Sequence, residues 1–252
     1  EILKEQKNLL KNYLQELKHF DMPMVYGAVN AMQQTGFKVN QFVLQVLKDI
    51  WDSGIALPSL PPSENAEIPN KPHDIATNKQ AKINWKRNAV IIHTENNRMA
   101  SKRLLLRKTI QIADKFKDEK AIYMVYQLDF RGRIYAVPNY LNPQGTDFAK
   151  GLLLFSEAKK LNEQGACHLA IHGANMFGYD KSSLQERIDW VQDNQERILS
   201  CAKDPLADLW WAKESDKPFQ FLAFCKEWEG LVADPENFES SLPVCADGSC
   251  NG

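Results

Sequence analysis

The chain has 252 residues, of which 44% are hydrophobic and 10% aromatic, so it can bury a core. It has no run of 18 apolar residues and no apolar segment at its amino end, which argues against a membrane span or secretion and predicts a soluble intracellular protein. Five scattered cysteines without CxxC spacing favour free thiols over a disulfide framework.

The first third of the chain predicts helices and then an irregular segment. Apolar residues recur near helical spacing in residues 2–19, 24–36 and 39–53, and the last two stretches each close on a glycine. The following stretch, Ala56–Pro72, contains five prolines, which neither a helix nor a strand accommodates for long. We therefore expect a linker there.

Residues 77–118 predict a long basic helix. Residues 78–120 hold twelve Lys or Arg against four Asp or Glu, which gives +8, so the net charge of −1 leaves −9 for the rest. Several of its basic residues lie at or near i, i+4 spacing and can share a face: Arg98, Lys102, Arg103 and Arg107. Charge alone leaves two interpretations open, a surface that binds a polyanion and a solvated helix face.

The remainder predicts mixed structure. From residue 121 the chain is rich in Tyr, Val and Ile and punctuated by Gly and Pro, so we expect strands and loops. Helices are predicted at 148–156, 162–178, 182–203 and in a segment that ends at Gly230. An acidic loop and a strand at 241–246 follow.

Two stretches carry groups suited to chemistry. In "DFRGRIY", two arginines, a glycine and two aromatics fall within seven residues; arginine suits phosphate, and Gly132 would allow close approach of a backbone. Asp247 follows "SLPVCA" and precedes Gly248, so a carboxylate would project from a strand end. By itself such an Asp is also a common turn former.

A zinc site is the weaker interpretation of the metal-binding residue types. Cys245 and Cys250 flank Asp247, and His168 and His172 stand at i, i+4. Neither pair is accompanied by a second CxxC or by HExxH, so we do not expect zinc.

The order and spelling of several strings resemble one family. "DFRGRIYAVPNYLNPQGTDFAKGLL", "IHGANMFGYDK", "DPLADLWWA", "FLAFCKEWEG" and "SLPVCADGSCNG" resemble the single-subunit DNA-dependent RNA polymerases of bacteriophages and mitochondria. The resemblance is strong over 121–252 and traceable from about Met22. "HGAN" and "FLAFC" lean towards the phage branch, whereas "DGSCNG" is also a mitochondrial spelling.

The resemblance implies roles for residues of the two stretches. "DGS" resembles polymerase motif A, in which Asp247 would hold two magnesium ions and Gly248 would offer a backbone carbonyl. Asp129, Gly132 and Arg133 match the family's DxxGR element, which grips template and RNA. Beside it, Tyr135 and Arg131 would bind nucleic acid.

The resemblance also assigns the basic residues. Lys150 and Lys181 match family positions near the nucleic acid or the incoming triphosphate. The region 77–118 looks like the thumb, whose helices hold the RNA–DNA hybrid. The implied partners are a DNA template, the hybrid and NTPs, bound by a monomer without membrane contact in the cytoplasm of a phage host rather than in mitochondria.

The family's later HDD-type motif and its fingers helix are absent from these 252 residues. We therefore expect a fragment that does not polymerise alone. The predicted fold is α+β and mostly helical, with thumb helices and a partial palm carrying a small antiparallel sheet. The expected divisions are 1–71 (end of an amino-terminal domain), 72–120 (thumb) and 121–252 (palm through motif A).

Two alternatives remain open. A nucleic-acid-binding module without catalysis would use the basic helix and the DFRGR loop and would bind without magnesium. A helical protein whose basic face meets a protein partner would not bind an RNA–DNA hybrid at low salt.

Overall fold

The computed structural model describes residues 11–129 and 131–244. The fold is mostly helical with small antiparallel sheets, as predicted. A helical stretch at 11–17 precedes the labelled elements. In chain order these are α2 (Pro23–Gln33), β1 (Gly36–Val39), α3 (Gln41–Ser53), α4 (Lys79–Phe116), β2 (Ile122–Tyr123), β3 (Tyr126–Leu128), β4 (Ile134–Ala136), α5 (Asp147–Gly151), β5 (Leu153–Phe155), β6 (Lys159–Lys160), α6 (Glu163–Phe177), α7 (Leu184–Asp193), α8 (Gln195–Lys203), α9 (Trp210–Glu214), α10 (Pro218–Ala233) and β7 (Glu239–Ser240).

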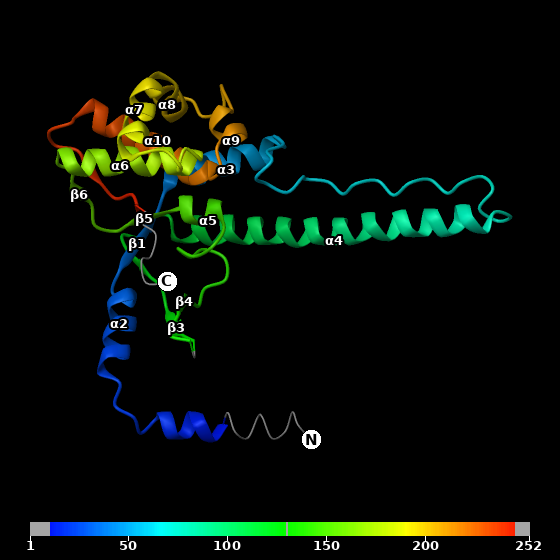
Figure 1. Ribbon diagram of the computed structural model, residues 1–252, viewed down its shortest axis with the longest axis horizontal. Helices are drawn as coiled ribbons and strands as arrows, with labels where there is room; N and C mark the ends of the chain where they lie inside the picture. The colour runs from blue at the N-terminus through cyan, green and yellow to red at the C-terminus, as the bar shows by residue number, and fades with distance from the viewer. Residues whose placement is uncertain (1–10, 130, 245–252) are drawn as a thin grey trace.

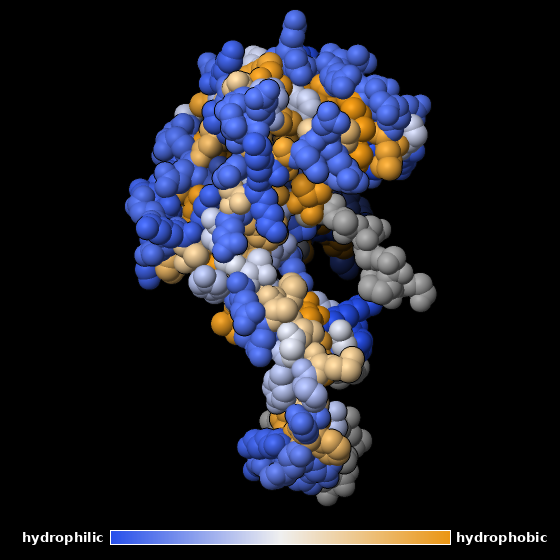
Figure 2. Space-filling view, turned by 90° about the vertical axis from the view of Figure 1, so that its left-hand side faces the viewer, coloured by the Kyte–Doolittle hydropathy of each residue, from blue (hydrophilic) through white to orange (hydrophobic). Residues whose placement is uncertain are grey.

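The elements form a helical body with two projections (Figure 1). Helices α3 and α6 to α10 make the body, α4 runs out from it as a long arm, and α2 descends from it towards the amino-terminal stretch. Seen from the side, the surface of the body is largely hydrophilic, with hydrophobic patches between its polar side chains (Figure 2). Among the described residues, none of the helices has the length and apolarity needed to cross a membrane.

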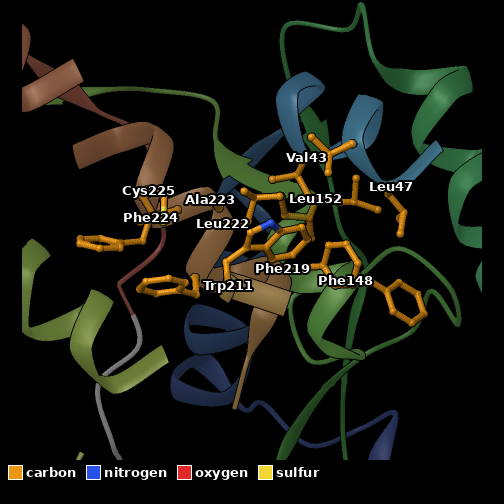
Figure 3. Packing of buried hydrophobic residues seen from close by; sticks show 14 of the residues in the cluster. Val43, Leu47, Phe148, Leu152, Trp211, Phe219, Leu222, Ala223, Phe224 and Cys225 are labelled. Carbon is orange, nitrogen blue, oxygen red and sulfur yellow. The ribbon is translucent and has the colours of Figure 1, made fainter. Parts of the chain in front are cut away.

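The core is organised around α10, whose sequence "FQFLAFC" is buried all round. Figure 3 shows Phe219, Leu222 and Phe224 of this helix between side chains of neighbouring elements. Trp211 of α9 meets Phe219 edge to face at 5.5 Å, and Phe148 of α5 does so at 6.4 Å. A helical stretch that is buried all round must be covered on every side, so residues 219–225 of α10 set the positions of α5, α6 and α8.

The central strand β1 corrects the predicted helices 24–36 and 39–53. Helix α2 ends at Gln33, and β1 pairs with both β2 and β5, with Phe37 opposite Ile122 and Phe155. A Cβ on Gly36 would crowd the Ser156 hydroxyl, so a larger residue there would require the Ser156 side chain to move. These partners are distant in the sequence, and local helical spacing therefore gave the wrong element at 36–39.

Other boundaries also differ from the sequence prediction. The helix expected at 148–156 stops at Gly151, because the next residues form β5 beside β1. The helix expected at 182–203 is interrupted at Asn194 and forms α7 and α8, and α10 continues past Gly230 to Ala233. The strand expected at 241–246 is absent over the described 241–244; the short strand β7 precedes it.

Candidate active site and nucleic-acid interface

Asp129, Arg131, Gly132 and Arg133 of the DFRGR segment lie in the turn of the β3–β4 hairpin. The strands pair Tyr126 with Ala136 and Leu128 with Ile134. The Asp129 carboxylate accepts hydrogen bonds from the backbone N–H groups of Arg131 (2.9 Å) and Arg133 (3.0 Å). Gly132 adopts φ +80°, a left-handed conformation that suits glycine. Asp129 and Gly132 of the DxxGR element therefore shape the turn.

The two arginines of the turn have different surroundings. Arg131 donates to the Asp129 carboxylate from Nε (2.9 Å) and Nη2 (2.8 Å) and also approaches the Tyr135 hydroxyl at 3.4 Å. The Arg133 N–H and then the Arg131 side chain lower the pKa of Asp129. The Arg133 side chain is exposed, and among the described residues its guanidinium makes no hydrogen bond. Arg133 is the arginine of this turn that is better placed to meet a phosphate.

The Pro-rich stretch packs along α4 instead of extending into solvent (Figure 1). We call residues 57–72 the strap. Asn96 makes a two-way contact with the strap backbone, accepting from Ala66 N–H (2.9 Å) and donating to Ala66 C=O (2.8 Å). The indole of Trp85 donates to Pro69 C=O at 2.7 Å. An extended chain without regular structure is thus held by side chains of the helix.

Arg103 is one of the residues that hold the strap. Its guanidinium donates to Pro62 C=O (3.0 Å) and to the Asn65 side chain (2.5 Å). Of the other arginines predicted to bind nucleic acid, Arg98 lies 3.4 Å from Glu95 and Arg107 is exposed. Lys102, also exposed, lines a cavity of about 510 Å³ between the strap and α5. The contacts therefore differ among the four residues predicted to bind nucleic acid, Arg98, Lys102, Arg103 and Arg107.

A side of α4 away from the strap carries lysines that the sequence analysis did not single out. Lys79, Lys86, Lys108 and Lys115 are all exposed. At 100° per residue they fall within about 40° of one another around the helix and roughly 80° or more from Trp85, Asn96 and Arg103. We call these four the lysine row. The signal available in the sequence was the seven-residue spacing within two pairs, Lys79 with Lys86 and Lys108 with Lys115. The position of the strap was also needed, because it shows which side of the helix is open.

Lys150 and Lys181 lie apart from the hairpin elements. Lys150 is in the last turn of α5, half-buried, and lines a small cavity of about 40 Å³ with His172 of α6. Lys181 is exposed in the connection from α6 to α7. Both remain predictions as binding residues.

Two part-buried carboxylates position α10 and were missed by the sequence analysis. Asp147 accepts from the backbone N–H groups of Phe219 (2.8 Å) and Gln220 (3.3 Å) at the start of α10. Glu227, further along α10, accepts from the Ser240 hydroxyl at 2.5 Å. Burial raises the pKa of both carboxyls, although these hydrogen bonds act in the opposite direction. No local sequence signal marks either contact, since each joins distant segments.

The segment that leads towards Asp247 is held at the edge of the central sheet. Phe155 N–H of β5 donates to Ser241 C=O at 2.8 Å, and β7 pairs with β6. Asp247 and Gly248 lie outside the described residues, so their role as metal ligands stays a prediction. In 11–129 and 131–244, no three His, Cys, Asp or Glu residues gather as a metal site; His172 is buried and His168 exposed.

Comparison with known proteins finds relatives along nearly the whole chain. The family model described as DNA-dependent RNA polymerase matches residues 159–252. The chain is 44% identical over 233 residues to the DNA-directed RNA polymerase of Enterobacteria phage T3, and 41% identical over 244 residues to T7 RNA polymerase of Escherichia phage T7. It is 36% identical over 236 residues to the mitochondrial DNA-directed RNA polymerase of Neurospora crassa.

These alignments cover 92%, 96% and 92% of this chain but only 26%, 27% and 16% of the respective relatives. The chain therefore spans about a quarter of the length of its phage relatives.

Proposed function

The chain belongs to the family of single-subunit DNA-directed RNA polymerases, and from that premise we propose that it forms the thumb and the first part of the palm of such an enzyme. The activity would be templated transfer of nucleotides from NTPs to the 3′ end of RNA. Identity of 41–44% over at least 92% of this chain to two phage polymerases is the observation that carries the proposal.

Within this proposal, Asp247 and Gly248 contribute ligands to magnesium. A carboxylate and a backbone carbonyl are hard oxygen donors, and their chemistry fits Mg²⁺. When bound, a pair of ions would align the attacking hydroxyl and the leaving pyrophosphate. Residues of this chain would position the segment that leads to Asp247. Ser241 is hydrogen-bonded to β5, and β5 pairs with the central strand β1.

The nucleic-acid contacts proposed for this chain lie on two elements. The β3–β4 hairpin would present Arg133 and Tyr135 from the turn that Asp129 and Gly132 shape. Helix α4 would be the thumb helix, with its open side towards the phosphates of the hybrid. Lys150 and Lys181 would lie nearer the triphosphate or the template.

We further propose a monomer that acts on a DNA template in the cytoplasm of a phage-infected host. The higher identity to the phage relatives (44% and 41%) than to the Neurospora relative (36%) supports a phage origin. The divisions 1–71, 72–120 and 121–252 remain part of this proposal.

The function is tested by replacing the matching segment of the phage T3 enzyme with this chain and measuring RNA synthesis. We expect Asp247→Asn to reduce the rate by roughly two orders of magnitude or more, because a lost ligand charge weakens transition-state stabilisation. Asp193→Asn, an exposed change on α7, is the matched control. Near-normal synthesis by Asp247→Asn would reject the metal role.

The basic side of α4 also favours a second candidate, a nucleic-acid-binding module without catalysis. Binding of an RNA–DNA hybrid by the isolated chain in EDTA, combined with an inactive chimera whose wild-type T3 counterpart is active, would favour that module.

A further inference from the structure

A carboxylate of α10 bonds to the segment that runs towards Asp247. Glu227 accepts a hydrogen bond from the Ser240 hydroxyl at 2.5 Å, and the backbone N–H of Ser241 lies close enough to lower the pKa of its carboxyl. Lys38 of β1 lies close enough to add an electrostatic attraction. The Ser240 oxygen in turn accepts from Leu242 N–H at 3.2 Å. A single side chain thus connects to three consecutive residues, directly or through one hydroxyl.

The strand pairing of this segment is too short to define its position well. The β6–β7 ladder consists of Lys159 opposite Ser240 and Lys160 opposite Glu239. Beyond it, Phe155 N–H donates to Ser241 C=O at 2.8 Å. A slip of one residue in this short ladder would move the chain by about 3.3 Å and turn the side chains of Glu239 and Ser240 to the opposite face.

The segment 240–242 is largely buried beside Glu227. Ser241 is 6% exposed and Leu242 9% exposed, although both follow a short strand near the end of the described residues. Asp247 comes six residues after Ser241, and six extended residues span at most about 20 Å. A displacement at Ser241 would therefore pass to Asp247 within a short length of chain.

We propose that Glu227 is a positioning residue that holds the register of 240–242 and thereby aims Asp247. The proposal rests on the proposed function of Asp247. It assigns to Glu227 no contact with substrate or metal. Its action is through the Ser240 hydroxyl and the Ser241 amide.

The first test measures amide hydrogen exchange on the 252-residue chain without metal. In Glu227→Ala, exchange at Ser241 and Leu242 should be about fivefold faster or more, since the Ser241 amide loses the carboxylate beside it and the Leu242 amide loses the fixed orientation of the Ser240 hydroxyl that accepts its hydrogen bond. Glu227→Gln, which keeps one acceptor oxygen, should recover part of the protection. Ser240→Ala should leave Ser241 protected and expose Leu242. Glu229→Ala, two residues along α10, is the matched control.

The second test measures RNA synthesis by the chimera with the phage T3 enzyme. Glu227→Ala should raise the half-saturating magnesium concentration about tenfold, an effect typical of residues that support metal ligands, while Glu229→Ala should not. Glu227→Ala and Ser240→Ala should be non-additive, because they break one shared contact.

Unchanged exchange at Ser241 in Glu227→Ala would overturn the proposal. So would faster exchange combined with the same magnesium dependence as Glu229→Ala, because Glu227 would then only stabilise the fold. Failure of the proposed function has a different signature, normal synthesis by Asp247→Asn.

Discussion

At the scale of single residues, His172 shows how the fold changes the properties of a buried ionisable group. His172 is 2% exposed and its Nδ1 has no hydrogen-bond partner in the described part of the chain. Burial lowers the pKa of His172 from 6.5 to about 4. The imidazole is therefore neutral in the folded protein at neutral pH, and protonating it requires either a charge in the core or unfolding.

This histidine should make stability fall as the pH falls. Between about pH 6.5 and 4 the unfolded chain binds a proton that the folded chain does not, so the unfolding free energy decreases in that window. We expect His172 to account for about 2 to 3 kcal/mol of the loss between pH 7.5 and 4.5. Urea unfolding of the wild type and of His172→Gln at both pH values measures it.

His168→Gln, an exposed change one turn earlier on α6, is the control and should keep the full pH dependence of the wild type. An equal loss of stability in the wild type and in His172→Gln would contradict this assignment.

At the scale of elements, α4 shows how a helix that is exposed over much of its length is supported. Four of its 38 residues are buried, Ala89, Leu106, Thr109 and Ala113, so core packing holds mainly its second half. Along the first half, Trp85 and Asn96 bind the strap backbone, and Arg103 extends this contact towards the body. The strap occupies one side of the helix and leaves the lysine row open.

The lysine row should carry the phosphate contacts of α4. Lys79 and Lys115 are about 54 Å apart along the helix, long enough to follow a nucleic-acid backbone. We expect Lys108→Gln combined with Lys115→Gln to reduce the slope of log K against log salt by about 1.5 to 2 for an RNA–DNA hybrid, because two phosphate contacts are lost. Filter binding at several salt concentrations measures the slope.

The control for this prediction is Lys203→Gln combined with Lys213→Gln, two exposed lysines on α8 and α9. Arg103→Gln should loosen the strap yet keep the slope. If the α8 and α9 pair reduced the slope as much as the α4 pair, the lysine row would not be the contact surface.

At the scale of the whole molecule, segments from all three predicted divisions share one core. One buried cluster contains Val43 and Leu47 of α3, Leu106 of α4 and the buried apolar residues of α10. The central sheet has the order β2-β1-β5, so its middle strand comes from the amino-terminal part and its edges from the palm-like part. Folding of the carboxyl-terminal part therefore depends on residues before the strap.

A chain shortened to residues 72–252 should lose cooperative unfolding. It lacks β1, which leaves β2 and β5 without the strand between them, and it lacks α3, which covers α10. Thermal unfolding followed by near-UV circular dichroism should show a broad transition or none, while the 252-residue chain unfolds sharply. A sharp transition in the shortened chain would show that 72–252 folds alone.

Features that depend on neighbours along the chain could be predicted from the sequence. The spacing of apolar residues predicted α3, α4 and α6 within a few residues, and the strings "DFRGR", "FLAFC" and "DGS" led to the polymerase family. Turn chemistry of this kind is local: Asp129 and Gly132 lie three residues apart, and the hydrogen bonds that they make close within five residues.

Features that depend on partners distant in the sequence became visible only in the folded chain. β1 is a strand because β2 and β5 flank it, Arg103 binds the strap 38 to 41 residues earlier, and Glu227 reaches a serine 13 residues away. A hydrogen bond or strand pair between remote segments leaves no periodic trace in either segment. For this reason the resemblance named the residues predicted to meet nucleic acid and metal, while the contacts proposed to position them became visible only in the fold.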